Sequence, residues 1–155
     1  SPRMVESVDS VLLAFGPKDR EHVQRLLDVA LQLAEPTGAT LYIQHVFPQE
    51  EYDDLIDQLD VSPDAESFGP SQLAARHEAI RTPAEQLDER EIDYEIRGAV
   101  GAPDTKVVRT ARNLEVDRVF IGGRGRSPTG KAMFGDYAQQ VLLNAPCPVT
   151  YVRRE

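Results

Sequence analysis

VFIGGRGRSPTGKAMFGD, residues 119–136, joins a short apolar run to the densest group of glycines in the chain. An apolar run of this length is typical of a buried strand. Glycines that follow such a strand let the backbone approach a phosphate group closely. The segment therefore predicts a strand that ends in an anion-binding loop.

Two common phosphate-binding motifs do not fit this loop. Gly125, Gly130 and Lys131 match the P-loop pattern GxxxxGK[ST], but Ala132 stands where the hydroxyl that holds Mg²⁺ is required. The dinucleotide fingerprint GxGxxG fails as well, because Pro128 occupies the position of its third glycine. The sequence argues against both a P-loop NTPase and a dinucleotide-binding fold.

A third spacing fits the loop better. Gly122, Gly125 and Gly135 follow the pattern G-x2-G-x9-G. The first two glycines allow a tight turn beside the strand end, and the third opens a helix whose free N–H groups attract an anion. The segment between them is long enough to wrap a polyphosphate.

Strand and helix patterns alternate along the rest of the chain. The predicted strands cover residues 8–15, 39–47, 92–97, 117–121 and 148–153. The predicted helices begin near Lys18 or Asp19, at Ser71, at Pro103 and at Tyr137. This order is typical of a parallel sheet covered by helices on both faces. In such sheets ligands bind beyond the carboxyl ends of the strands.

The connection from residue 48 to residue 70 contains eight acidic residues and no basic one. We expect a solvated, flexible loop or flap here. A metal site is the less favoured alternative, because the carboxylates lack the compact spacing and central glycine of an EF-hand. In the helix that follows, over residues 71–89, Pro83 is expected to introduce a kink or a break.

The composition is typical of a globular protein, since 41% of the 155 residues are hydrophobic and 28% are charged. We expect a single domain over residues 1–155. No apolar run reaches the roughly 20 residues of a membrane-spanning helix, and the first ten residues lack the pattern of a signal peptide. The net charge of −9 argues against nucleic acids and anionic membranes as partners.

The acidic balance, with only three lysines, indicates a salt-adapted protein. Cys147 is the only cysteine, so an internal disulfide is excluded and a cytoplasmic location is expected. The three histidines, His22, His45 and His77, are scattered along the sequence. His45 precedes Val46 on a predicted buried strand and faces either the sheet interior or the ligand end. A structural or surface role is the favoured expectation, and the sequence predicts neither a catalytic residue nor a metal ligand.

These features together resemble the universal stress protein family. The resemblance rests on the five-strand alternation, on residues 119–136 and on the closing segment LLNAPCPVTYVR, residues 142–153. It implies an open, doubly wound α/β sheet of strand order 3-2-1-4-5 with helices on both faces, the adenine nucleotide alpha hydrolase-like fold. It also implies a homodimer through the last strand, residues 148–153, and binding of ATP in one subgroup of the family.

The resemblance implies a nucleotide site at the ends of the first, second and fourth strands and at the start of the last helix. Position by position, the implied contacts are Ala14, Phe15 and Gly16 beside the adenosine, Val46 at the adenine, Ile121, Gly122, Arg124 and Gly125 along the ribose and phosphates, and Gly135, Asp136 and Tyr137 at the phosphate tail.

Two positions depart from the family pattern. Gly16 stands where binders usually carry an acidic residue, and Asp136 replaces the serine or threonine that closes the motif. A hydroxyl donates a hydrogen bond to phosphate, whereas a carboxylate only accepts one. Two unit charges about 4 Å apart repel by roughly 4 kcal/mol at an effective dielectric constant near 20, which weakens binding about a thousandfold if nothing compensates.

Compensation and capping are two alternatives at this position. Arg124, Arg126 and Lys131 lie in the same loop, and a divalent cation such as Mg²⁺ would bridge Asp136 to a phosphate. Alternatively, Asp136 is the N-cap of the last helix, with Gln139 completing a capping box. In that case the anion site is closed by the chain itself.

Three functions follow from these alternatives. The first is a stress-response regulator that binds ATP, ADP or AMP without rapid turnover. The second is a dimeric interaction module of the same fold, in which Asp136 caps the anion site. The third is a slow ATPase, which Lys131 supports and which the lack of an evident general base opposes.

Overall fold

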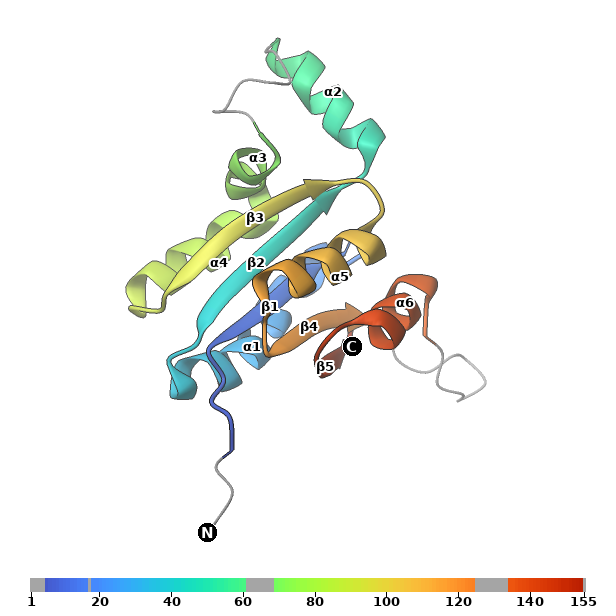
Figure 1. Ribbon diagram of the computed structural model, residues 1–155. Coiled ribbons are helices and arrows are strands. Elements are labelled where there is room, and N and C mark those ends of the chain that lie inside the picture. The colour runs from blue at the N-terminus through green and yellow to red at the C-terminus, as the bar shows by residue number, and fades with distance from the viewer. Residues whose placement is uncertain (1–4, 17, 61–68, 125–133, 155) are drawn as a thin grey trace.

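The computed structural model of this chain describes residues 5–16, 18–60, 69–124 and 134–154. Within these ranges, five strands form one parallel sheet in the order β3-β2-β1-β4-β5 (Figure 1). They are β1 (Ser10–Phe15), β2 (Thr40–Phe47), β3 (Tyr94–Val100), β4 (Arg118–Gly123) and β5 (Val149–Arg153). The predicted fold class and strand order are confirmed.

Helices cover both faces of the sheet. They are the 3-10 helix η1 (Arg20–His22), α1 (Val23–Thr37), α2 (Gln49–Leu59), α3 (Pro70–Arg76), α4 (Glu78–Glu89), α5 (Pro103–Leu114) and α6 (Asp136–Asn144). Side chains of α1 and α4 pack on one face. Those of α5 and α6 pack on the opposite face, toward the viewer in Figure 1. In the described part of the chain, no helix is both long enough and apolar enough to cross a membrane.

The central strand β1 shows why helices cover the sheet on both faces. Val11, Leu13 and Phe15 point toward α1 and α4, whereas Leu12 and Ala14 point toward α5 and α6. All five side chains are buried. A strand that is apolar on both sides is stable only between two layers, which is the usual position of parallel strands.

The acidic connection contains a helix, so the expectation of a loop is wrong for residues 49–59. Tyr52 and Ile56 lie four residues apart on the buried side of α2 and pack near Phe47. Residues at this spacing share one helix face, and the acidic residues occupy the solvent side. Residues 61–68 of the expected flap lie outside the described ranges.

The break in the predicted helix over residues 71–89 falls at His77 and not at Pro83. His77 has an extended backbone conformation, ends α3 and caps α4, because its Nδ1 atom accepts a hydrogen bond of 3.1 Å from the backbone N–H of Ala79. Pro83 lies inside α4 and is buried. The N-cap hydrogen bond thus fixes where the second helix begins.

The strand order locates the crevice where ligands bind in folds of this kind. The chain runs outward from β1 through β2 to β3, and then returns to β4 on the other side of β1 before reaching β5. The winding therefore reverses between β1 and β4. Beyond the carboxyl ends of these two strands lies the topological switch point of the sheet.

Candidate functional site

Two pockets lie beside Gly16, at the carboxyl ends of the central strands. The polar pocket has a volume of about 370 Å³ and is lined by Gly16, Lys18, Asp19, Pro103, Gly122, Gly123, Arg124, Gly135, Asp136, Tyr137, Ala138 and Arg154. The histidine pocket has a volume of about 120 Å³ and is lined by Phe15, Gly16, Arg20, Val23, His45, Val46, Pro48, Glu51, His77 and Ala79. Gly16 belongs to both walls and joins the two pockets.

Most residues implied by the resemblance gather in these two walls. The polar pocket contains Gly16, Gly122, Arg124, Gly135, Asp136 and Tyr137, and the histidine pocket contains Phe15, Gly16 and Val46. Ala14 and Ile121 line neither pocket, because both are fully buried in the core beneath α5 and α6. Gly125 lies outside the described ranges.

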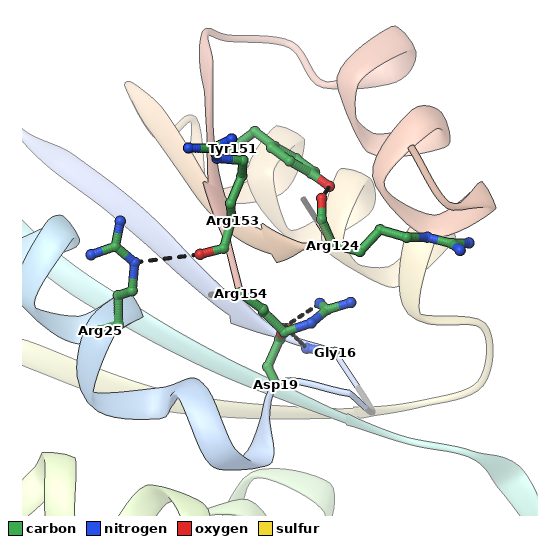
Figure 2. Close-up of polar contacts among 7 residues, drawn as sticks. All are labelled: Gly16, Asp19, Arg25, Arg124, Tyr151, Arg153 and Arg154. Carbon is green, nitrogen blue, oxygen red and sulfur yellow. Dashed lines mark hydrogen bonds and ion pairs between the residues drawn. The ribbon is translucent and has the colours of Figure 1, made fainter. Parts of the chain in front are cut away.

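Asp19 is a residue of the polar pocket that the sequence analysis missed. Its side chain is only 1% exposed. Its Oδ2 atom accepts a hydrogen bond of 2.7 Å from the backbone N–H of Gly16, and its Oδ1 atom pairs with Nη1 of Arg154 at 2.9 Å (Figure 2). A buried carboxylate therefore lies beside Gly16, although position 16 itself carries no acidic side chain.

A turn brings Asp19 to this place. Its backbone N–H donates a hydrogen bond of 3.1 Å to the carbonyl oxygen of Gly16. An aspartate that bonds to the backbone a few residues away is a known turn signal, so Asp19 was detectable in principle. Arg154 was not, because it follows the last predicted strand and meets Asp19 only across the folded sheet.

The glycines at the end of β4 make room for side chains of the protein itself. A Cβ atom at Gly122 would collide with the carboxylate of Asp19, and one at Gly123 would collide with the ring of Tyr151. The Tyr151 hydroxyl donates a hydrogen bond of 2.5 Å to the carbonyl oxygen of Arg124 (Figure 2). Gly122 thus permits the close approach of Asp19, in addition to the turn expected from the sequence.

The N-terminus of α6 forms another part of the polar pocket wall. Gly135 is the N-cap, Asp136 is the first helical residue, and Gln139 donates its backbone N–H to the carbonyl oxygen of Gly135 at 3.0 Å. The prediction of an Asp136 N-cap with a Gln139 capping box is therefore wrong. Among the described residues, no side chain caps the first N–H groups of α6.

Tyr137 places a buried hydroxyl in the same wall. Within the described part of the chain, this hydroxyl has no hydrogen-bond partner. Burial raises the pKa of the Tyr137 phenol, and the negative charges of Asp19 and Asp104 raise it further. The group therefore stays protonated and keeps one hydrogen-bond donor available.

The histidine pocket brings together two of the histidines that are scattered in the sequence. The rings of His45 and His77 are 4.3 Å apart between centroids. Burial, followed by the nearby His77, lowers the pKa of His45 to about 4. Burial also lowers the pKa of His77, although Glu51 and Glu78 oppose this shift. The expectation of separate structural or surface roles misses this pairing.

Known proteins share both the sequence pattern and the fold. The sequence model of the universal stress protein family matches residues 8–153. A universal stress protein from Thermus aquaticus, named for its position in the 3′ region of QAH/OAS sulfhydrylase, is 30% identical over 146 residues, which cover 93% of this chain and 98% of that protein.

Two solved structures show the same fold at lower sequence identity. The universal stress protein UspA from Lactobacillus plantarum has a TM-score of 0.69 and 18% identity, with 96% of this chain and 100% of that chain covered. The universal stress protein from Archaeoglobus fulgidus in complex with dAMP has a TM-score of 0.60 and 19% identity, with 94% and 98% covered. The family match spans nearly the whole length of this chain. We therefore conclude that the chain belongs to the universal stress protein family.

Proposed function

We propose that this protein is a stress-response regulator that binds an adenine nucleotide at the carboxyl ends of β1 and β4. The observation that carries the proposal is the pair of pockets joined at Gly16, one polar and one partly apolar. The base and the phosphate of a nucleotide require two such environments side by side. The dAMP complex of the relative from Archaeoglobus fulgidus supports this class of ligand.

The charges of the polar pocket favour an anion. Lys18, Arg124 and Arg154 line it together with the two carboxylates of Asp19 and Asp136. Among the described residues of this wall, cations therefore outnumber anions, although the whole chain has a net charge of −9. The N–H groups at the start of α6 add a partial positive charge. We assign the phosphate of the nucleotide to this pocket.

Asp136 sets the preferred number of phosphates. Its side chain is exposed, so water and salt screen its repulsion of a phosphate below the roughly 4 kcal/mol of a less solvated pair. Each additional phosphate adds negative charge near this carboxylate. We therefore propose that AMP and ADP bind more tightly than ATP, unless Mg²⁺ bridges Asp136 and the phosphates.

The remaining contacts follow from the walls of the two pockets. Phe15 and Val46 offer apolar surface to the adenine ring in the histidine pocket. Asp19 replaces the acidic residue that is missing at Gly16 and accepts hydrogen bonds from the ribose. The Tyr137 hydroxyl, which lacks a partner among the described residues, donates to the phosphate.

Titration calorimetry with AMP, ADP and ATP, with and without Mg²⁺, tests the proposal. We expect micromolar binding that Asp136→Ser strengthens for ATP. Tyr137→Phe keeps the fold, since the hydroxyl has no partner among the described residues, and weakens nucleotide binding. No heat up to millimolar nucleotide with the wild-type protein and with Asp136→Ser contradicts the proposal. A turnover assay with labelled ATP tests the alternative of a slow ATPase.

A second function, a homodimeric interaction module, is favoured by the edge of the sheet. β5 is an edge strand, and edge strands have open hydrogen-bonding groups. Leu142 and Leu143 on α6 are 37% and 71% exposed. We propose a homodimer through residues 148–153, as the resemblance implies. Light scattering should give twice the chain mass, and Leu143→Glu should lower it if α6 extends the interface.

A further inference from the structure

Three side chains that commonly bind metal ions meet in the wall of the histidine pocket, and each comes from a different part of the fold. His45 lies in β2, Glu51 in the first turn of α2, and His77 at the junction of α3 and α4. One potential ligand atom of each lies within 4.8 Å of those of the other two. We propose that His45, Glu51 and His77 bind a divalent transition-metal ion, with Zn²⁺ as the representative case.

A buried atom without a partner is the second observation that points to a ligand here. His45 is 9% exposed, and its Nε2 atom has no hydrogen-bond partner among the described residues. Burying a polar atom in this way is unfavourable unless something binds to it. Since His45 lines the histidine pocket, an ion held between the three residues would satisfy this nitrogen.

The donor set suits zinc. Two imidazole nitrogens and one carboxylate oxygen are a usual Zn²⁺ ligand set, which leaves a coordination position open for water or another ligand. Tetrahedral bonds of about 2.0–2.2 Å place neighbouring ligand atoms about 3.3–3.6 Å apart. The present cluster is wider at its upper limit of 4.8 Å. Glu51 is exposed, so rotation of its side chain can shorten its own distances to the two histidines.

The N-cap hydrogen bond of α4 determines which nitrogen of His77 can bind an ion. Its Nδ1 atom accepts the backbone N–H of Ala79, so Nε2 is the nitrogen that remains for an ion. In the neutral ring this arrangement places the proton on Nε2. Binding of an ion through Nε2 requires this proton either to be lost or to move to Nδ1. A proton on Nδ1 would break the hydrogen bond from Ala79 that caps α4. We therefore expect faster hydrogen exchange of the Ala79 amide in the metal-bound protein.

A bound ion would also fasten α2 to the sheet. Glu51 is a residue of α2, whereas His45 belongs to β2, so coordination links the acidic helix to the strand beside it. This site goes beyond the proposed nucleotide function, and it needs no nucleotide to form. The two proposals are tested with different ligands, so one can fail while the other stands.

Metal titration of the tag-free protein, first stripped with a chelator, is the direct experiment. Zn²⁺ is titrated calorimetrically, and Co²⁺ is added as a spectroscopic probe. We expect one ion per chain with a dissociation constant in the micromolar range or below, and the intense visible absorption of four-coordinate Co²⁺. No binding below millimolar metal overturns the proposal.

The variants identify the ligands. His45→Phe, Glu51→Gln and His77→Asn should each weaken binding by at least the roughly 10–100-fold that loss of a supporting residue causes in metal sites. Asparagine at position 77 keeps a side chain that can cap α4.

The matched control is His22→Asn, because His22 is the one histidine outside the cluster. An equal loss in His22→Asn overturns the assignment. Glu51→Gln decides the question if a histidine variant unfolds, since Glu51 is exposed.

Discussion

Asp19 and Arg154 lie 135 residues apart in the chain, and their side chains form an ion pair of 2.9 Å in the wall of the polar pocket. Asp19 follows β1 at the centre of the sheet, and Arg154 follows the edge strand β5 (Figure 2). The same carboxylate accepts the backbone N–H of Gly16. This pair therefore connects the segment after β1 with the segment after β5 at the proposed nucleotide site.

Removing Arg154 should destabilise the protein, because a buried carboxylate then loses its positive partner. We expect Arg154→Ala to lower the free energy of unfolding by roughly 3 kcal/mol, as for other broken buried pairs. Urea denaturation at pH 7 measures the change. Arg153→Ala is the control, because the side chain of Arg153 is exposed. Equal stability of both variants would show that the pair is unimportant.

Gly122 should not tolerate a methyl group. A Cβ atom there would collide with Asp19, so Gly122→Ala should cost about 1–3 kcal/mol of stability, the usual range for an overpacked core. A double-mutant cycle identifies the cause. In the Asp19→Ala background the collision is gone, and the added cost of Gly122→Ala should be much smaller. Additive losses would contradict the proposed contact.

The burial of Ile56 should make α2 part of the folded core. Ile56→Ala should lower the free energy of unfolding by about 2–4 kcal/mol, because buried apolar contacts are lost and a cavity is left behind. Leu59, on the same helix, is 42% exposed, and Leu59→Ala should change stability by less than about 0.5 kcal/mol. If α2 is detached from the core in solution, both variants will instead unfold at the wild-type urea concentration.

Cys147 should stay protonated at neutral pH and therefore react slowly with alkylating reagents. Burial raises its pKa, and Asp117 opposes the effect of Arg118. A raised pKa means that less thiolate is present at a given pH, so alkylation should accelerate only at higher pH than for a free thiol. The midpoint of the rate against pH measures this shift and does not depend on steric access. A midpoint at or below that of free cysteine would refute it.

The strands were predictable because each combines an apolar run with a clear stop. In β1, Phe15 is followed by Gly16 and then Pro17, and this punctuation marks the strand end within a few residues. The alternation of strand and helix patterns also predicted a layer of helices on each face of the sheet. The order of the strands followed from the family resemblance, and the register confirms it.

Features that depend on tertiary contacts were harder to predict from the sequence. In α2, Tyr52 and Ile56 are the buried residues among many acidic ones, so composition indicated a loop although the spacing allowed a helix. The pairing of His45 with His77 depends on where α4 begins, and a local hydrogen bond to Ala79 decides that. Propensity and composition average over a segment, whereas these contacts depend on single atoms.

The position of Arg154 has a consequence for how the protein is made. Synthesis runs from the N-terminus to the C-terminus, so Asp19 leaves the ribosome long before its partner exists. Until β5 has joined β4, the carboxylate of Asp19 cannot form its ion pair with Arg154. A nascent chain that still lacks Arg154 therefore cannot complete this wall of the polar pocket, so the proposed nucleotide site requires synthesis to have passed β5.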